Sequence, residues 1–286
     1  MNYAPVVVFG YNRADMLKDL FESLEKNRNV DKMVLYIFVD IPGQRQKRDN
    51  KLSEEVMRYV EYYQVHSKFK KVFVEVAKEH KGLANSIISG VTKVINQYGK
   101  VIVLEDDLVV SNDFLDYMQR GLEYYRYYHN VWSISGHCIS IKGIERYKGD
   151  VFLLPRIESI GWATWKNRWN RTDWSVASYP KFKHDFLKRA AFNIGGRDLT
   201  KMLDAQMRNS EYDSWAIRWG YQQFLEKKYT VYPVQSRVVH RGNDNRSTHG
   251  AYISPQPLKK VYSRCRFTAL KPNWKLIWEH RKAQKC

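Results

Sequence analysis

The alternation of short apolar runs with amphipathic segments in the first part of the chain constrains the fold more than any other feature. Four runs are rich in β-branched residues and too short for core helices, so they are predicted to be buried strands: Val6 to Phe9, Met33 to Val39, Val72 to Val76 and Val101 to Leu104. Three segments with helical spacing lie between them: Ala14 to Lys26, Ser53 to Gln64 and Asn85 to Tyr98. This order indicates an α/β fold with a parallel sheet wound by right-handed crossovers.

The pattern changes after residue 107 and predicts a mixed second half. Helices are expected at about 112–129 and 214–227, and extended runs at 131–135, 151–154 and 229–233. With 286 residues, of which 44% are hydrophobic, the chain can bury a large core, which excludes a small disulfide-stapled module. We predict one domain over residues 1–258, with halves 1–107 and 108–258, followed by a basic, aromatic tail over 259–286.

The charge of the chain indicates a negative partner. A net charge of +18 suits nucleic acid, phosphate-bearing substrates or an anionic membrane surface. The tail alone has nine Lys or Arg residues and one Glu. No helix-turn-helix, zinc knuckle or RNP-like strand accompanies this charge, so we expect no nucleic acid partner and prefer phosphates of a substrate or of lipids.

The cysteines and the start of the sequence bear on the compartment. Cys138, Cys265 and Cys286 form no CxxC or Cys/His spacing, so neither a disulfide framework nor a zinc site is indicated. The first residues lack the features of a signal peptide, and no apolar stretch reaches about 18 residues. We therefore expect a cytoplasmic protein that is soluble or peripheral on the inner face of the cell membrane.

Three consecutive carboxylates, Glu105, Asp106 and Asp107, directly follow the fourth apolar run. Carboxylates beside a buried strand are costly unless a cation meets them, and ligands of α/β sheets gather at the carboxyl ends of strands. A divalent Mg²⁺ or Mn²⁺ shared with a diphosphate fits such hard oxygen ligands. The alternative interpretation is an acidic turn that caps the next helix.

Other polar residues follow neighbouring strands. Asp40 ends the second strand and either accepts hydrogen bonds from a base or ribose or simply starts a turn. Tyr11 offers a ring for stacking, and Arg13 is either a cation of the site or a solvated residue at a helix start. The segment from Lys81 to Asn85 opens a helix whose free N–H groups can face a phosphate or sugar hydroxyl.

These features together resemble the GT-A glycosyltransferases, which use nucleotide sugars: YNR after the first strand, Asp closing the second, KGLANS, and the acidic triplet after the fourth. The segment VLEDDLVVSNDFLDYM resembles the N-acetylglucosaminyltransferases that build N-glycan branches. The second half is more similar to bacterial surface-polysaccharide transferases of the family 2 type, in GWATWKNRW, DSWAIRW, YPVQS and the GxD and TH pairs of the polar loop. The matched segments reach from about residue 3 to residue 250.

The resemblance implies a GT-A fold, which is a Rossmann-like, mainly parallel mixed sheet flanked by helices, and a role for each matched residue. Asp107 would hold the metal, Asp106 would contact ribose or donor sugar, and Glu105 would support them. The nucleotide-sugar site would also include Tyr11, Arg13, Asp40, Lys81 and Asn85. Asp213 matches the general base of an inverting transfer, its alternative being an N-cap for the helix that follows.

His249 matches a histidine that completes the metal shell, although a lone loop histidine is otherwise a surface residue. The loop departs from the family pattern at His240 and Arg241. Trp162, Trp165 and Trp169 are candidates for an acceptor platform, because sugar C–H faces pack on aromatic rings. Their spacing of three and four also fits the core face of a short helix, and we expect at least one ring of each kind.

We therefore predict a metal-dependent, inverting glycosyltransferase that moves a sugar, with UDP as the preferred nucleotide, to a lipid-linked or other glycan acceptor of a bacterial surface polysaccharide. A nucleic-acid-binding protein and an inactive carbohydrate-binding protein are the alternatives. The tail is predicted either to dock on an anionic membrane or to pack back on the domain. In the docked form, its apolar face is formed by Phe267, Leu270, Trp274, Ile277 and Trp278.

Overall fold

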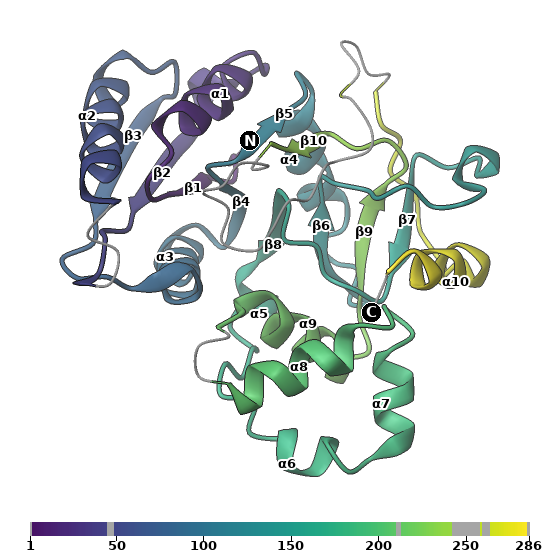
Figure 1. The fold of residues 1–286 in the computed structure, drawn as a ribbon. Coiled ribbons are helices and arrows are strands. Elements are labelled where there is room, and N and C mark those ends of the chain that lie inside the picture. Colours follow the sequence, from purple (N-terminus) through teal and green to yellow (C-terminus); the bar gives the residue numbers. More distant parts are fainter. Residues whose placement is uncertain (1, 45–48, 210–212, 242–257, 259–263, 285–286) are drawn as a thin grey trace.

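A computed structural model describes residues 2–44, 49–209, 213–241, 258 and 264–284. Its main feature is an eight-stranded sheet in the order β3-β2-β1-β4-β8-β6-β9-β7, flanked by helices (Figure 1). The strands β5 and β10 form a separate two-stranded sheet. Within the described part of the chain, no helix combines the length and the apolar character needed to span a membrane.

The first half has the predicted alternation of strands and helices. Its elements are β1 Val6–Gly10, α1 Ala14–Leu24, β2 Val34–Val39, α2 Asn50–His66, β3 Lys71–Val76, α3 Gly82–Tyr98 and β4 Lys100–Glu105. The strand β1 pairs in parallel with β2 and β4, and β2 pairs in parallel with β3. All five residues of β1 are buried, because helices cover both faces of a parallel sheet. The parallel α/β architecture predicted from the sequence is confirmed.

The second half is mixed, as predicted. Its elements are β5 Leu108–Val110, α4 Phe114–Tyr124, β6 Val131–Ser135, β7 Val151–Leu154, β8 Trp162–Trp165, α5 Lys166–Trp169, α6 Tyr179–Phe182, α7 Phe186–Phe192, α8 Leu199–Arg208, α9 Trp215–Leu225, β9 Tyr229–Pro233, β10 Val238–His240 and α10 Trp274–Ala283. The strand β8 runs antiparallel to both β4 and β6. It is therefore an antiparallel strand at the centre of the sheet, between two strands that run in the same direction. The helix α4 ends earlier than predicted, because turns closed by Tyr128 and Val131 redirect the chain into β6.

The tryptophan-rich segment belongs to the core, as one interpretation of its spacing predicted, but not as the face of one short helix. Residues 162–165 form the central strand β8 rather than a helix, and Trp162 and Trp165 are only 1% and 5% exposed. The ring of Trp162 packs against Trp219 and Trp169 at centroid distances of 4.5 and 5.6 Å. The predicted acceptor platform of Trp162 and Trp165 is therefore wrong, because their rings fill the core on the two faces of the sheet.

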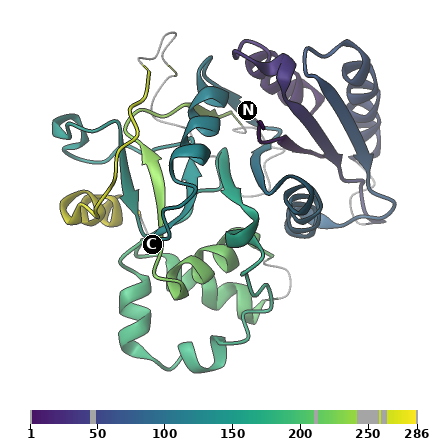
Figure 2. The ribbon, with the colours of Figure 1, turned by 180° about the vertical axis from the view of Figure 1, so that it is seen from behind.

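The described part of the tail, residues 264–284, packs on the domain. Phe267 lies on α4 with its ring centroid 5.4 Å from that of Tyr117, and α10 buries Leu276 and Ile277 against β7 and β9. The single apolar face predicted for the tail is thus wrong, since Phe267 and Ile277 turn inward. Seen from both sides, α10 lies at the opposite end of the molecule from α1 and α2 (Figures 1 and 2).

The packing of α10 places an imidazole in the interior. His280 is 2% exposed, and burial together with the positive charge of Arg156 lowers its pKa to about 3, against the attraction of Glu158 and Asp198. The folded protein therefore holds His280 neutral, whereas the unfolded chain takes up a proton below about pH 6.5. This difference removes stability as the pH falls from about 6.5 towards 3, by up to about 1.4 kcal/mol per pH unit.

Replacing His280 by Gln is expected to reduce this acid sensitivity. The difference in unfolding free energy between pH 7 and pH 5 should be about 2 kcal/mol smaller in His280→Gln than in the wild type, because the titrating group is gone. Urea titrations at the two pH values measure it. An unchanged pH dependence in the variant would show that His280 is protonated as readily in the folded protein as in the unfolded chain.

Candidate active site

The acidic triplet lies where β4 ends, beside the end of β1. Asp106 and Asp107 are 4% and 8% exposed. The guanidinium of Arg13, the residue before α1, reaches both carboxylates, with Nη2 2.7 Å from Asp106 Oδ1 and 2.9 Å from Asp107 Oδ2. Parallel pairing of β1 with β4 produces this contact, since the residues that follow the two strands share one edge of the sheet. Arg13 is thus a cation of the site and not a solvated helix-start residue.

A second partner of Asp107 comes from the far part of the chain. The strand β10 pairs antiparallel with β5, with His240 opposite Leu108, which brings His240 Nε2 to 3.1 Å from Asp107 Oδ2. The amide of Arg241 donates a hydrogen bond of 2.7 Å to the carbonyl of Asp107. His240 was noted in the sequence only as a departure from the family pattern. The register of β5 with β10, which the sequence did not predict, makes it a member of the site.

Burial and mutual repulsion disfavour the charged forms of two of the three carboxyl groups. Burial and repulsion by Asp107 and Asp106 raise the pKa of Glu105 to about 8, and burial raises the pKa of Asp106 to about 7 although Arg13 opposes it. Burial would also raise the pKa of Asp107, but hydrogen bonds and charge from His240 and Arg13 lower it. A cation bound at this end of the strands would favour the charged forms of Glu105 and Asp106 and lower their pKa values.

Asp40 organises the neighbouring turn. Its Oδ1 accepts hydrogen bonds from the amides of Ile41 and Lys81, both 3.0 Å, and its Oδ2 accepts one of 2.8 Å from Gly82. His80 Nδ1 lies 3.2 Å from the same Oδ2. Asp40 thus caps the start of α3 and fixes it against β2, more than a plain turn residue would do. Its contact with a nucleotide stays a prediction.

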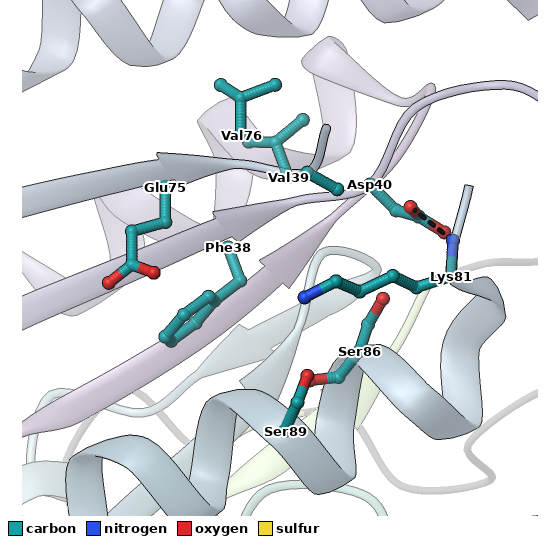
Figure 3. Close-up of a pocket in the computed structure, with 9 residues that line it drawn as sticks. Phe38, Val39, Asp40, Glu75, Val76, Lys81, Ser86 and Ser89 are labelled. Atoms are coloured by element: carbon teal, nitrogen blue, oxygen red, sulfur yellow. Dashed lines mark hydrogen bonds between the residues drawn. The ribbon is translucent and has the colours of Figure 1, made fainter. Parts of the chain in front are cut away.

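A pocket opens beside this turn, between β2, β3 and the first turns of α3. The Lys81 side chain extends over it towards Phe38 and Glu75, with Ser86 and Ser89 on the helix below (Figure 3). The other two predicted members, Asn85 and Tyr11, do not line the pocket. Asn85 is exposed and donates to the carbonyl of Lys81 at 3.0 Å, and the Tyr11 ring lies 6.2 Å from that of His80.

Asp213 stands in front of α9 but does not cap it. Ser214 is the N-cap, since its hydroxyl accepts the amide of Ile217, so the capping alternative for Asp213 is wrong. The Asp213 side chain is 41% exposed and forms a 2.6 Å ion pair with Arg218. Its role as a base stays a prediction. His249 lies outside the described residues.

The carboxylates at the strand ends suit a divalent cation whose other ligands are the phosphates of a bound nucleotide. Among the described residues, no three His, Cys, Asp or Glu side chains are arranged to enclose a metal by themselves. One or two carboxylates are what Mg²⁺ or Mn²⁺ needs when a diphosphate supplies the remaining ligands. Asp107, with Asp106 beside it, has this chemistry.

Among the rings of the tryptophan-rich segment, Trp174 remains partly exposed. It lines a groove of about 750 Å³ between α3 and α5, together with polar side chains that include Thr92, Asn96 and Asn170. Trp174 packs on Trp169 with ring centroids 4.8 Å apart.

Comparison with protein families gives a match over most of the described chain. The model of the GNT-I family matches residues 1–189. This range includes Arg13, Asp40, Lys81 and the acidic triplet, but neither Asp213 nor β10. No curated protein gives a significant match to the sequence.

Solved structures with a similar fold are distant in sequence. GalNAc-T7 with UDP, GalNAc and Mn²⁺ is 11% identical with a TM-score of 0.50, and the match covers 88% of this chain and 46% of that one. TarS 1–349 of S. aureus in complex with UDP-GlcNAc is 10% identical with a TM-score of 0.47 over 88% and 62% of the two chains. The mannosyltransferase PcManGT of Pyrobaculum calidifontis, in complex with GDP-Man and Mn²⁺, is 14% identical with a TM-score of 0.38 over 59% and 47%.

This chain thus spans less than two thirds of the length of each of these structures. The likeness to GalNAc-T7 concerns the fold, and the GT-A fold predicted from the sequence is confirmed.

Removing the guanidinium of Arg13 is expected to destabilise the protein strongly. The Arg13→Gln variant leaves Asp106 and Asp107 buried without their shared cation, which typically costs about 3–5 kcal/mol. Arg241→Gln is the matched control, since it removes an exposed ion pair with Asp19 that is worth about 0–1 kcal/mol. Chemical denaturation in EDTA measures both. Equal losses in the two variants would mean that the buried ion pairs of Arg13 do not stabilise the strand ends.

Proposed function

Because the chain belongs to the GNT-I family, we propose that it is a glycosyltransferase, which moves a sugar from a nucleotide-sugar donor to a glycan acceptor. The observation that carries this proposal is the pair of buried aspartates at the end of β4, held by Arg13 and His240. The Asp40 turn and the Lys81 pocket lie at the ends of the neighbouring strands, where α/β sheets bind nucleotides.

A divalent ion, Mn²⁺ or Mg²⁺, belongs to the proposed site. Asp107 would hold it, and the ion would supply positive charge to the diphosphate that leaves. Arg13 orients the Asp106 and Asp107 carboxylates, and His240 contacts the same Oδ2 of Asp107 that Arg13 reaches. The exposed ammonium of Lys81 adds a further cation for the donor phosphates.

Asp213 is the proposed general base, which takes the proton of the acceptor hydroxyl as that oxygen attacks the anomeric carbon. Arg218 supports it, because the guanidinium donates to Asp213 Oδ1 and also, at 3.2 Å, to the carbonyl of Ser214. These bonds fix the carboxylate on the backbone in front of α9 while its side chain stays open to solvent. A base separate from the donor carboxylates suits an inverting transfer, in which attack comes from the face opposite the leaving group.

The finer assignment follows from the family resemblance of the sequence. UDP is the preferred nucleotide, because the acidic segment resembles the N-acetylglucosaminyltransferases. The acceptor is a glycan of a bacterial surface polysaccharide such as an O-antigen or capsule, carried on a lipid, because the second half resembles the family 2 type transferases. Such a reaction would take place in the cytoplasm at the inner face of the membrane.

Donor binding is expected to require both a divalent ion and Asp107. In a thermal-shift screen of UDP, GDP, CDP and dTDP sugars, a UDP sugar should raise the melting temperature only with Mn²⁺, since stabilisation grows as RT ln(1 + [L]/Kd). Asp107→Asn should abolish this shift and Mn²⁺-dependent turnover. Asp116→Asn, which changes an exposed aspartate of α4 in the same way, should retain both. Full turnover of Asp107→Asn in excess EDTA would refute the metal role.

Asp213→Asn is expected to lower kcat by about 10²- to 10⁴-fold with donor affinity little changed, since it removes the base. Its stability should remain, because the residue is exposed and not the helix cap. Ser214→Ala is the comparison variant, since loss of the true N-cap should cost about 1 kcal/mol of stability. If Asp213→Asn keeps its kcat, the base lies elsewhere. NMR of the anomeric configuration of the product tests inversion independently.

A further inference from the structure

The outward side of α10 combines exposed tryptophans with cations. The helix is fixed to the domain by Leu276, Ile277 and His280, which are all buried. On the opposite side, Trp274 and Trp278 are 63% and 50% exposed. They are four residues apart, so the two rings lie one helical turn apart on the same side.

Cations accompany these rings. Lys275 is exposed on the helix, Lys271 is exposed just before it, and the guanidinium of Arg281 lies 4.8 Å from the ring centre of Trp278. Lys282 is also exposed, but its ammonium forms an ion pair with Glu279 at 2.9 Å. Over residues 264–284 the sequence has six Lys or Arg and one Glu. We call the set of Lys271, Trp274, Lys275 and Trp278 the α10 face.

This arrangement is typical of a helix that lies in a membrane interface. Tryptophan prefers the headgroup level of a bilayer, where its ring is apolar on one side and its N–H is wet on the other. Lysines beside such rings can keep their ammonium groups at the lipid phosphates. In contrast, two rings surrounded by cations make too small an apolar area for a stable contact with a second copy of the chain, which needs about 800 Å² per partner.

The inward packing of α10 also holds the helix in place, so that the α10 face points towards solvent. The N-cap Asn273 accepts the amide of Leu276, and Arg281 Nε donates to the carbonyl of Asn193 at 2.8 Å. A free amphipathic tail would have to order its helix on binding, at a cost in affinity, whereas this helix is already formed. It lies beside β7, the edge strand farthest from β3, so the pocket beside Asp40 remains at the other end of the sheet (Figures 1 and 2).

We propose that the α10 face docks the protein on an anionic lipid surface. Trp274 and Trp278 enter the headgroup region, and Lys271 and Lys275 contact lipid phosphates. This inference deepens the proposed function, on which it rests for its purpose: a lipid-linked acceptor would be met at the surface where the enzyme is bound. The docking itself depends only on the α10 face.

Vesicle binding of the whole chain without nucleotide sugar tests the proposal, separately from any transferase activity. The wild type should sediment with vesicles of phosphatidylcholine and phosphatidylglycerol, but not with phosphatidylcholine alone, and less at high salt. Trp274→Ser with Trp278→Ser should weaken binding tenfold or more, since burial of one large apolar side chain is worth about 1.5–3 kcal/mol, which is about tenfold or more in affinity. Lys271→Glu with Lys275→Glu should weaken it at least about fivefold per position.

Matched controls separate the α10 face from overall composition and charge. Tyr62→Ser with Tyr127→Ser removes two exposed rings elsewhere, and Lys51→Glu with Lys70→Glu makes the same change of charge near the β3 end of the molecule. Both should bind vesicles much as the wild type does. The melting temperatures of all variants should stay close to that of the wild type, because every changed side chain is exposed.

Several results would overturn the proposal. Absence of wild-type binding to anionic vesicles would do so, as would equal losses in the lysine pairs of the α10 face and of the β3 end, which would indicate diffuse attraction. Tryptophan variants that bind vesicles normally but lose self-association or binding to single-stranded nucleic acid would assign the α10 face to that partner instead. A protein that docks as proposed and yet transfers no sugar would leave this inference standing and contradict the proposed function.

Discussion

The interaction on which the site depends is the meeting of Arg13 with two buried aspartates at the centre of the sheet. Three carboxylates in a row at the end of a buried strand are unfavourable unless cations reach them. The parallel pairing of β1 with β4 brings the first cation to the aspartates, because Arg13 lies in the short turn between β1 and α1. The second group, His240, needs the short β5 and β10 ribbon, and this explains why the chain returns to the centre of the sheet late in the sequence.

The rest of the fold holds this edge in place. Asp40 ties the start of α3 to the end of β2, so the pocket residues keep a fixed position relative to the triplet. The antiparallel β8 joins the two halves of the sheet, and its tryptophans build a core that also supports the start of α9, where Asp213 stands. The strand-end carboxylates and Asp213 therefore depend on one continuous sheet.

The first half could be predicted closely, because its elements follow from local patterns. Apolar runs such as Val101 to Leu104 admit only a buried strand, and the position of Asp106 and Asp107 after it follows from that. Trp162 and Trp165 show the limit of such reasoning. Their spacing fits a helix face, but pairing with two neighbouring strands decided the structure, and no local pattern reports that.

The contact of His240 and the orientation of α10 do not follow from local patterns either. Family resemblance predicts a histidine at the metal from His249, whereas the register of β10 against β5 places His240 beside Asp107. In the tail, the spacing predicts one apolar face, but the structure buries Leu276 and Ile277 against the domain and leaves Trp274 and Trp278 exposed to solvent. Both outcomes are set by contacts between residues far apart in sequence, which periodicity does not encode.

The most direct test of the central claim is a crystal structure of the protein with Mn²⁺ and a uridine diphosphate sugar, using anomalous scattering to locate manganese. We predict one strong anomalous peak bound to Asp107 and the diphosphate, with Arg13 still on Asp106 and the nucleotide beside the Asp40 turn. A nucleotide bound elsewhere, or one bound there with no manganese and with Asp107 held only by Arg13 and His240, would contradict the account.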